Sequence, residues 1–194
     1  MPGPGRPPRT SAREIEVAAL DLFSRYGFDA TTVEEIAAAA GVSRRTFFRY
    51  FPSKADVLWG QFDAEVDTLR RLLEETSPSL PLMTAIREAV VAANAYRPED
   101  IPELRTRMSL VNEVPELFAN AAVHYDAWEH AISEFVARRA ACPPDSLYPL
   151  TIARATLATC RAAYDIWIAR ADTDLTVYLD EALGVLCALP TTRA

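Results

Sequence analysis

The first 55 residues contain closely spaced helix-capping and helix-ending residues, which leave room only for short helices. Gly27 and Gly41 follow two apolar helical patterns, and glycine readily takes the left-handed conformation that closes a helix. The segment Thr32–Glu35 has the sequence signature of a capping box. Ser43 can cap a third helix, which Pro52 ends because proline cannot continue a helical hydrogen-bond ladder. We predict helices from Ser11 to about residue 26, from Thr32 to Gly41 and over residues 44–51.

Nearly all of the remaining sequence also has helical character. Strand-like alternation is scarce, whereas alanine, leucine, glutamate and arginine, which favour helices, are abundant. Ser53 is expected to cap a long fourth helix that runs to about Leu73, and prolines then mark the starts and breaks of five more. Their expected bounds are 82–96, 100–110, 114–139, 146–170 and 174–188. The sequence therefore predicts an all-α chain of nine helices in two domains.

Composition and charge predict where the chain is divided. Residues 1–10 are rich in proline and glycine and are expected to form a flexible arm. Residues 1–55 carry eight Lys/Arg and six Asp/Glu, whereas residues 56–194 carry twelve and 21, for a net charge of −7. A cationic head on an anionic body suits a protein that touches a polyanion with one end, although counts this small can also arise by chance. We predict a head over 11–55 and a body over 56–194.

Several classes of protein are disfavoured by what the sequence contains. Its three cysteines are far apart, which favours a reducing compartment without disulfides. The N-terminus has no apolar signal-peptide core, and no run approaches the roughly 18 apolar residues that span a membrane. We therefore expect a cytoplasmic protein that does not use a membrane. His124 and His130 are six residues apart, which does not suit a metal pair on one helix, and no glycine-rich phosphate loop or nucleophile–base pair is recognisable. We expect no metal, no cofactor and no enzymatic activity.

The segment RRTFFRYF at residues 44–51 concentrates cations and aromatic rings in an acidic protein. On a helix, Phe47 and Phe51 share one face and would pack inward, so that Arg45 and Arg49 point away from the core. Two short capped helices joined by a glycine turn form a helix-turn-helix arrangement, whose second helix enters the DNA major groove. An exposed helix face with cation–π contacts would explain the same pattern without DNA.

The side chains on and around this helix match the chemistry of duplex DNA. An arginine fork can pair with guanine, Phe48 can contact a thymine methyl group, and hydroxyl, ammonium and main-chain N–H groups suit phosphates. Arginines on the N-terminal arm could reach an adjacent minor groove. The expected DNA-binding residues are Thr32, Arg44, Arg45, Thr46, Phe48, Arg49, Tyr50, Lys54, Arg6 and Arg9.

The segment Ala18–Leu58, which includes GVSRRTFFRYFPSK, closely resembles the signature of TetR-family transcriptional regulators. The resemblance implies a homodimer that binds a palindromic operator through its first three helices, with a small-molecule pocket and a dimer interface in the C-terminal region. The family's recognition positions fall on Arg44, Arg45, Thr46, Phe48, Arg49 and Tyr50, followed by Lys54. Phe48 stands where the family often has tyrosine, so a hydroxyl contact to phosphate is missing there.

A narrower resemblance extends into the body. The segments RRTFFRYFPSK, WGQFDAE, ELRTRM and EFVARR are similar to those of mycofactocin-system regulators. This similarity implies acyl-CoA thioesters as the effector class.

Aromatic, thioether and polar residues recur at helical spacing through the body. They could line a ligand tunnel with a few orienting polar groups, or they could simply form the core, since aromatic residues are mostly packed inside. His124 could equally be a hydrogen-bonded structural histidine. The candidate pocket residues are Trp59, Phe62, Met83, Asn94, Arg105, Met108, Asn112, His124, Tyr125, Trp128, Tyr164 and Trp167.

The last two predicted helices have wide apolar stripes. Such stripes fit a four-helix seam between two copies of the chain, or an intramolecular core. The candidate dimer residues are Leu157, Cys160, Tyr164, Leu179, Leu183 and Leu186.

The helix-turn-helix pattern and the two family resemblances together predict a ligand-responsive transcriptional repressor. It would leave DNA when a hydrophobic or acyl-CoA-like effector binds. The alternatives are a constitutive DNA-binding protein without an effector and an enzyme that uses the body cavity.

Overall fold

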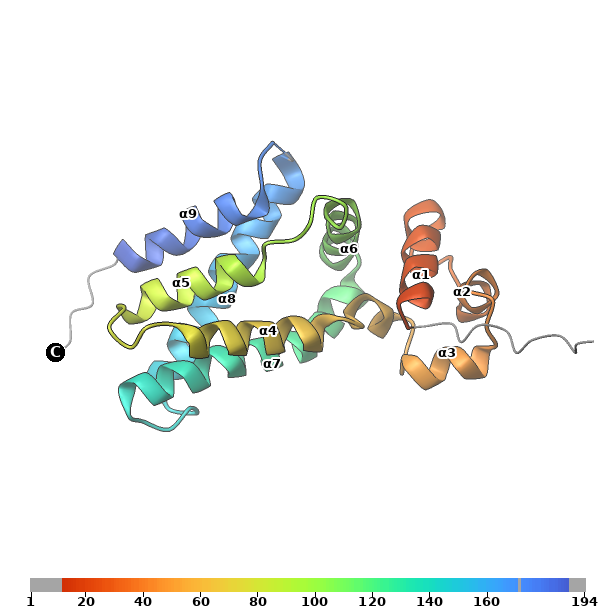
Figure 1. Ribbon diagram of the computed structural model, residues 1–194. Helices are drawn as coiled ribbons and strands as arrows, with labels where there is room; N and C mark the ends of the chain where they lie inside the picture. The colour runs from red at the N-terminus through yellow and green to blue at the C-terminus, as the bar shows by residue number, and fades with distance from the viewer. Residues whose placement is uncertain (1–11, 171, 189–194) are drawn as a thin grey trace, which may run out of the picture. The chain divides into compact units, whose positions relative to one another are not determined.

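The computed structural model describes residues 12–170 and 172–188, and helices joined by loops make up this part of the chain (Figure 1). Within these residues the structure has nine α-helices, one 3-10 helix and no strand, so the predicted all-α fold is confirmed. No helix in this part of the chain combines the length and apolar character that crossing a membrane requires. Ser11, Arg6 and Arg9 lie outside the described residues. The elements are α1 (Ala12–Tyr26), α2 (Val33–Ala39), α3 (Arg44–Tyr50), η1 (Ala55–Trp59), α4 (Phe62–Glu75), α5 (Leu82–Ala93), α6 (Ile101–Glu113), α7 (Pro115–Ala140), α8 (Leu147–Arg170) and α9 (Leu175–Ala188).

The chain forms two compact units whose bounds differ from the predicted division at residue 55. In the described residues, the N-terminal unit contains 12–60 and also 110–120, where α6 ends and α7 begins. The C-terminal unit contains 61–109, 121–170 and 172–188. The sequence did not predict that residues 110–120 group with the head, because their packing partners are distant in the chain.

The three short helices of the N-terminal unit pack around a small aromatic and aliphatic core. α1 contacts α2 and η1, and α2 contacts α3. Ile15, Phe23, Ile36, Phe47 and Leu58 are all at most 1% exposed. Burial of large apolar side chains is the main driving force for folding a unit of this size.

The predicted capping residues hold the ends of these helices. Gly27 and Gly41 have φ angles of 87° and 67°, which are unfavourable for residues with a side chain. The hydroxyl of Thr32 accepts a hydrogen bond from the main-chain N–H of Glu35, whose carboxylate accepts one from the N–H of Thr32. The hydroxyl of Ser43 accepts from the N–H of Thr46 at 3.1 Å. The capping box and the Ser43 cap are thus confirmed.

The prediction of one long fourth helix was wrong. Ser53 accepts a hydrogen bond from the N–H of Asp56, but the helix that follows is the short 3-10 helix η1. The chain leaves it at Gly60, and α4 begins at Phe62. Glycine is a poor helix former, and its small size is needed here: a Cβ on Gly60 would lie 1.8 Å from Oε1 of the buried Glu16.

The C-terminal unit is a layered bundle with one continuous hydrophobic core. α4, α5 and α9 lie side by side in that order, and α8 packs against α9 (Figure 1). Arg87 on α5 forms a two-bond ion pair with Asp180 on α9, with nitrogen–oxygen distances of 2.6 and 2.5 Å. Leu69, Ile86 and Trp167 are at most 1% exposed and belong to the same core. The core therefore joins helices from across the body sequence.

Candidate functional site

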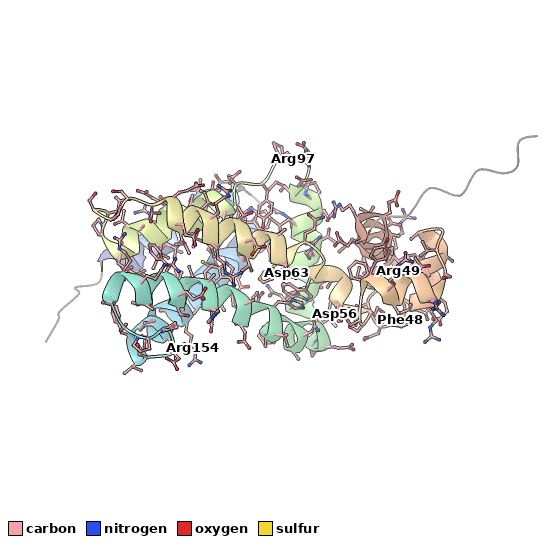
Figure 2. The ribbon with its side chains drawn as sticks, turned by 60° about the horizontal axis from the view of Figure 1, so that its bottom comes forward. Phe48, Arg49, Asp56, Asp63, Arg97 and Arg154 are labelled. Carbon is pink, nitrogen blue, oxygen red and sulfur yellow. The ribbon has the colours of Figure 1, made fainter. Side chains whose placement is uncertain are left out.

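Helix α3 presents a cationic outer side because its aromatic residues anchor its inner side. Phe47 is fully buried and Phe51 is 3% exposed, and their ring centres are 5.8 Å apart. Arg44, Arg45 and Arg49 are exposed. Figure 2 labels Phe48 and Arg49 on this helix, and Phe48 is 42% exposed. The structure therefore places these residues as the amphipathic pattern predicts.

The three arginines differ in how strongly neighbouring residues hold them. Nε of Arg44 lies 3.0 Å from a carboxylate oxygen of Glu34, and its guanidinium stacks 5.3 Å from the ring centre of Phe48. Arg49 stacks over the ring of Tyr50 at 4.9 Å. Arg45 makes no hydrogen bond or ion pair with any residue in the described part of the chain. Arg45 can therefore offer all five N–H donors to DNA, whereas the Nε–H of Arg44 is already paired with Glu34.

The side chain of Lys54 binds main-chain carbonyl groups, which the sequence did not predict. Its ammonium donates to the carbonyl oxygens of Phe28 at 2.7 Å and of Thr31 at 3.0 Å, and it lies 3.9 Å from the ring centre of Phe28. An ammonium has three N–H donors, so at most one is left for a phosphate. Lys54 thus joins the segment after α3 to the loop between α1 and α2.

The N-terminus of α2 is less open to phosphate than predicted. The N–H groups of Thr32 and Glu35 are both bonded inside the capping box. Two carboxylates, those of Glu34 and Glu35, lie in the first turn of this helix, and hydrogen bonds from Thr32 lower the pKa of Glu35. Negative charge at this end opposes an incoming anion unless Arg44 compensates it.

Most of the predicted pocket residues meet within the C-terminal unit. Tyr164 on α8 donates a hydrogen bond to Asn94 at 2.7 Å, and its ring meets Trp167 edge to face at 6.1 Å. The guanidinium of Arg105 stacks 4.4 Å from the ring centre of Trp167.

A second group of aromatic side chains joins α4 to α7. The ring of Phe62 contacts His124 and Tyr125 with centre distances of 5.9 and 6.3 Å. Arg161 on α8 lies 5.9 Å from the ring centre of Tyr125. Met83, Met108 and Trp128 pack as partly buried residues against the core of the same unit.

Two of the predicted pocket residues lie outside the C-terminal unit, and a third belongs to its core. Trp59 and Asn112 belong to the N-terminal unit, and Asn112 is exposed. Trp167 is fully buried and functions as core beneath Arg105. Helical spacing alone could not separate these cases, because it indicates a face and not the neighbour that covers it.

Two polar residues of this region, Tyr96 and Arg107, were not among the predicted site residues. Burial, reinforced by the carboxylate of Glu65, raises the pKa of Tyr96, and burial with the neighbouring Tyr96 raises that of Tyr164. Arg107 is 9% exposed and pairs with Glu103 at 3.0 Å. The sequence of α6 alone does not single out Arg107 among its arginines, because burial depends on the helices packed around it.

Three of the six predicted dimer residues are interior, which corrects the prediction for those three. Leu179 and Leu183 are fully buried in the chain's own core, and Cys160 is 6% exposed. Burial raises the pKa of the Cys160 thiol to about 12, so it behaves as a small apolar group. Leu157, Tyr164 and Leu186 are partly buried. The exposed apolar residues of α8 and α9 are instead Leu147, Tyr148, Ile166, Val177 and Val185.

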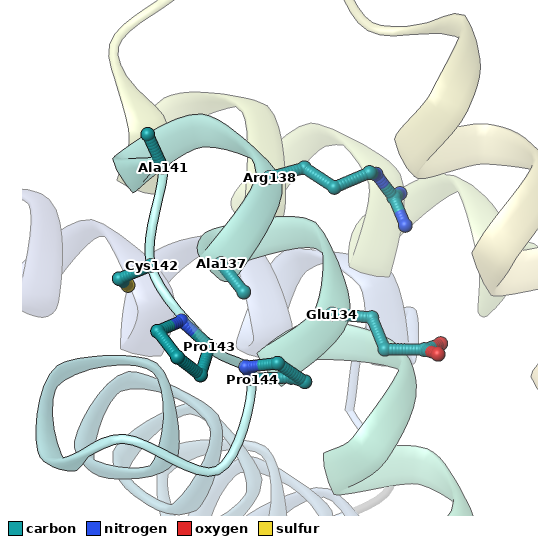
Figure 3. A pocket seen from close by; sticks show the side chains of 7 residues that line it. All are labelled: Glu134, Ala137, Arg138, Ala141, Cys142, Pro143 and Pro144. Atoms are coloured by element: carbon teal, nitrogen blue, oxygen red, sulfur yellow. The ribbon is translucent and has the colours of Figure 1, made fainter.

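A pocket of about 490 Å³ lies at the turn between α7 and α8, and none of the predicted pocket residues lines it (Figure 3). Glu134 and Arg138 extend from α7, and the chain turns past them at Cys142 and two prolines. The lining residues are Glu134, Ala137, Arg138, Ala141, Cys142, Pro143 and Pro144. In the described residues, no group of three His, Cys, Asp or Glu side chains could hold a metal ion.

Known protein families match segments in both units of the chain. Residues 15–58 match the family of bacterial regulatory proteins of the tetR family, and residues 80–189 match the MftR C-terminal domain. The chain is 36% identical over 180 residues to a Mycobacterium tuberculosis protein proposed to be the mycofactocin biosynthesis transcriptional regulator MftR. That alignment covers 93% of this chain and 89% of the relative.

Two solved structures share the fold over nearly the whole chain. FadR of Thermus thermophilus, a TetR-family repressor solved with lauroyl-CoA, has a TM-score of 0.58 and 26% identity, covering 95% of this chain and 97% of that one. FadR of Bacillus subtilis, solved with stearoyl-CoA, has a TM-score of 0.64 and 15% identity, covering 92% and 98%. With its helix-turn-helix head and its MftR-type C-terminal domain, the chain belongs to the TetR family of transcriptional regulators.

Proposed function

We propose that this regulator binds a palindromic operator as a homodimer, represses transcription there, and leaves the DNA when an acyl-CoA-like effector binds. The observation that carries the DNA-binding half is the arrangement of α3. Phe47 fixes the helix from inside, while Arg45 and Arg49 are exposed on it. α3 would enter the major groove, where an arginine fork can pair with the O6 and N7 atoms of guanine.

A two-fold symmetric dimer would place two copies of α3 on two half-sites about one helical turn of DNA apart. The exposed residues Ile166, Val177 and Val185 of α8 and α9 supply apolar surface for such an interface. Native mass spectrometry of protein purified from its own host tests this, since the measured mass gives both the number of subunits and any retained ligand.

Binding to a labelled duplex from the upstream region of the regulator's own gene tests the DNA-binding proposal. Phosphate contacts release counterions, so a dimer that neutralises roughly 6–10 phosphates should lose about 10³–10⁵ in affinity between 50 and 200 mM salt. Fluorescence anisotropy measures this slope, with a duplex of scrambled sequence as the control. Equal affinity for both duplexes would contradict an operator in this upstream region.

The effector proposal is supported by the C-terminal unit and by the two FadR structures with acyl-CoA. The unit combines an apolar core with a few polar groups, such as Asn94 and Tyr164, which is the composition of ligand sites. An effector that weakens DNA binding tenfold must favour the released state by about 1.4 kcal/mol.

Lauroyl-CoA, stearoyl-CoA and free CoA can be compared in one assay. We expect the two thioesters, and not CoA, to raise the melting temperature and to release the labelled duplex. A protein that binds DNA but responds to neither thioester would be a regulator without this effector. Hydrolysis of the thioesters, detected by the free thiol that it releases, would instead indicate an enzyme.

A further inference from the structure

Arg107 is a buried arginine on α6, and one of its donors has no acceptor. Its Nη2 donates to Oε1 of Glu103 at 3.0 Å. Its Nε–H is shielded from solvent and has no hydrogen-bond partner in the described part of the chain. Buried N–H groups are almost always bonded, because leaving one without an acceptor costs free energy. The missing acceptor therefore points to an atom from outside the chain.

The position of Arg107 excludes an ordinary surface role. Leu104, one turn earlier on α6, is 8% exposed and belongs to the hydrophobic core of the C-terminal unit. Met108, the next residue after Arg107, also packs against this core. An acceptor that reaches the Nε–H therefore arrives in apolar surroundings, as the polar end of a hydrophobic molecule would.

Other polar groups lie around the same place. The hydroxyl of Tyr164 donates to Asn94 at 2.7 Å. Burial and the Glu65 carboxylate raise the pKa of Tyr96, whereas the positive charge of Arg107 acts in the opposite direction. Tyr96 and Tyr164 interact with each other as well. Both phenols stay neutral near pH 7, so they can hydrogen-bond an uncharged ligand group.

We propose that the Nε–H of Arg107 binds the carbonyl oxygen of a fatty acyl thioester, which deepens the proposed function and rests on it. The charge of Arg107 is already balanced by Glu103, 3.0 Å away. A second carboxylate or a phosphate would be repelled by Glu103, whereas a neutral carbonyl needs only one donor. The acyl chain then lies against the apolar side of α6.

The test compares three ligands that differ at one group. Lauroyl-CoA has the carbonyl oxygen, its S-dodecyl thioether replaces that carbonyl with a methylene group, and lauric acid carries a carboxylate. Isothermal titration of the full-length protein gives the three dissociation constants. We expect the wild type to bind the thioester about tenfold or more tightly than the thioether, because a buried charged donor would lose its acceptor.

The variants Glu103→Gln and Glu103→Gln/Arg107→Met isolate the role of the guanidinium. Glu103→Gln keeps the Nε–H and should keep the preference for the thioester. The double variant removes the donor without leaving the half-buried carboxylate of Glu103 unbalanced, so it should bind thioester and thioether equally. Thermal unfolding checks that both variants are folded.

Each outcome decides between the proposals. Equal binding of thioester and thioether by the wild type, or a preference that persists in the folded double variant, contradicts the role of Arg107 while the acyl-CoA effector stands. Lauric acid binding as tightly as lauroyl-CoA contradicts the preference for a neutral carbonyl. Binding of neither CoA ligand contradicts both this inference and the effector class. Where the double variant does not fold, the wild-type ratio alone decides.

Discussion

The ammonium group of Lys54 donates a hydrogen bond to the main-chain oxygen of Phe28 at 2.7 Å and lies 3.9 Å from the centre of the same residue's ring. A second bond reaches the oxygen of Thr31 at 3.0 Å. Because Lys54 follows α3 and the two carbonyls lie in the loop between α1 and α2, one side chain fixes the end of the proposed recognition helix to that loop.

We expect Lys54→Met to destabilise the N-terminal unit by about 1.5–3 kcal/mol, the range for hydrogen bonds to charged groups. It should also weaken operator binding, since α3 loses its support. Urea unfolding and anisotropy measure the two effects, and Arg25→Met, on the exposed side of α1, is the control. An unchanged unfolding midpoint would show that the two carbonyl bonds add nothing.

Replacing Arg45 or Arg49 with alanine should lower operator affinity by about 1–3 kcal/mol and leave folding intact. Arg44→Ala should cost less, because part of the charge of Arg44 is already balanced by Glu34, 3.0 Å away. Anisotropy titrations of the three variants test this order. If Arg45→Ala and Arg49→Ala both bind like wild type, neither residue reads the operator.

Phe47→Ala should destabilise the N-terminal unit by about 3–5 kcal/mol, because it empties a fully buried site in a small core. Phe48→Ala is the matched control, since that neighbouring ring is 42% exposed. Thermal unfolding followed by circular dichroism compares them. Equal losses in the two variants would mean that the inner and outer faces of α3 are wrongly assigned.

Gly60→Ala should destabilise the protein by about 1–3 kcal/mol through overpacking against Glu16 and Phe51. Its new Cβ would lie 1.8 Å from Oε1 of Glu16 and 2.9 Å from the ring of Phe51. Adding Glu16→Ala should relieve part of the loss, so a double-mutant cycle should show favourable coupling. If the effects of the two substitutions on the free energy of unfolding simply add, the loss in Gly60→Ala does not come from contact with Glu16.

The ion pair of Arg87 and Asp180 should support stability except in acid. The hydrogen bond from Arg87 lowers the pKa of Asp180 below its ordinary 3.8. Its stabilising effect is therefore present above that value and is lost as the pH falls through the lowered pKa. At neutral pH the wild type should be slightly more stable to urea than Asp180→Asn, because an exposed ion pair contributes little. This difference in stability between wild type and Asp180→Asn should disappear below pH 3.8.

Local signals predicted much of the helical framework because caps, glycines and prolines act within a few residues. The Thr32–Glu35 capping box and the first-turn proline of α7 are examples. The need for glycine at residue 60 was missed because the carboxylate that leaves no room for a side chain there, that of Glu16, is 44 residues away. The same limit hid the role of Lys54, whose partners belong to the α1–α2 loop.

The outer face of α3 could be predicted from local sequence, whereas the ligand and dimer residues depend on partners distant in the chain. The outer face of α3 follows from the phase of one short helix, set by Phe47. The ligand and dimer residues depend on which helices cover a face, so Leu179 and Leu183 were assigned outward although they are interior. Arg107 could not be told from Arg105 by sequence, because a buried guanidinium is recognised only by what surrounds it.

Lys54 is the only lysine among the 194 residues, so the protein carries a single side-chain amine. An amine-reactive reagent can modify it only while its ammonium is released from the carbonyls of Phe28 and Thr31. The labelling rate, measured by mass spectrometry, would thus report how often the hydrogen bonds of Lys54 open. No engineered probe is needed.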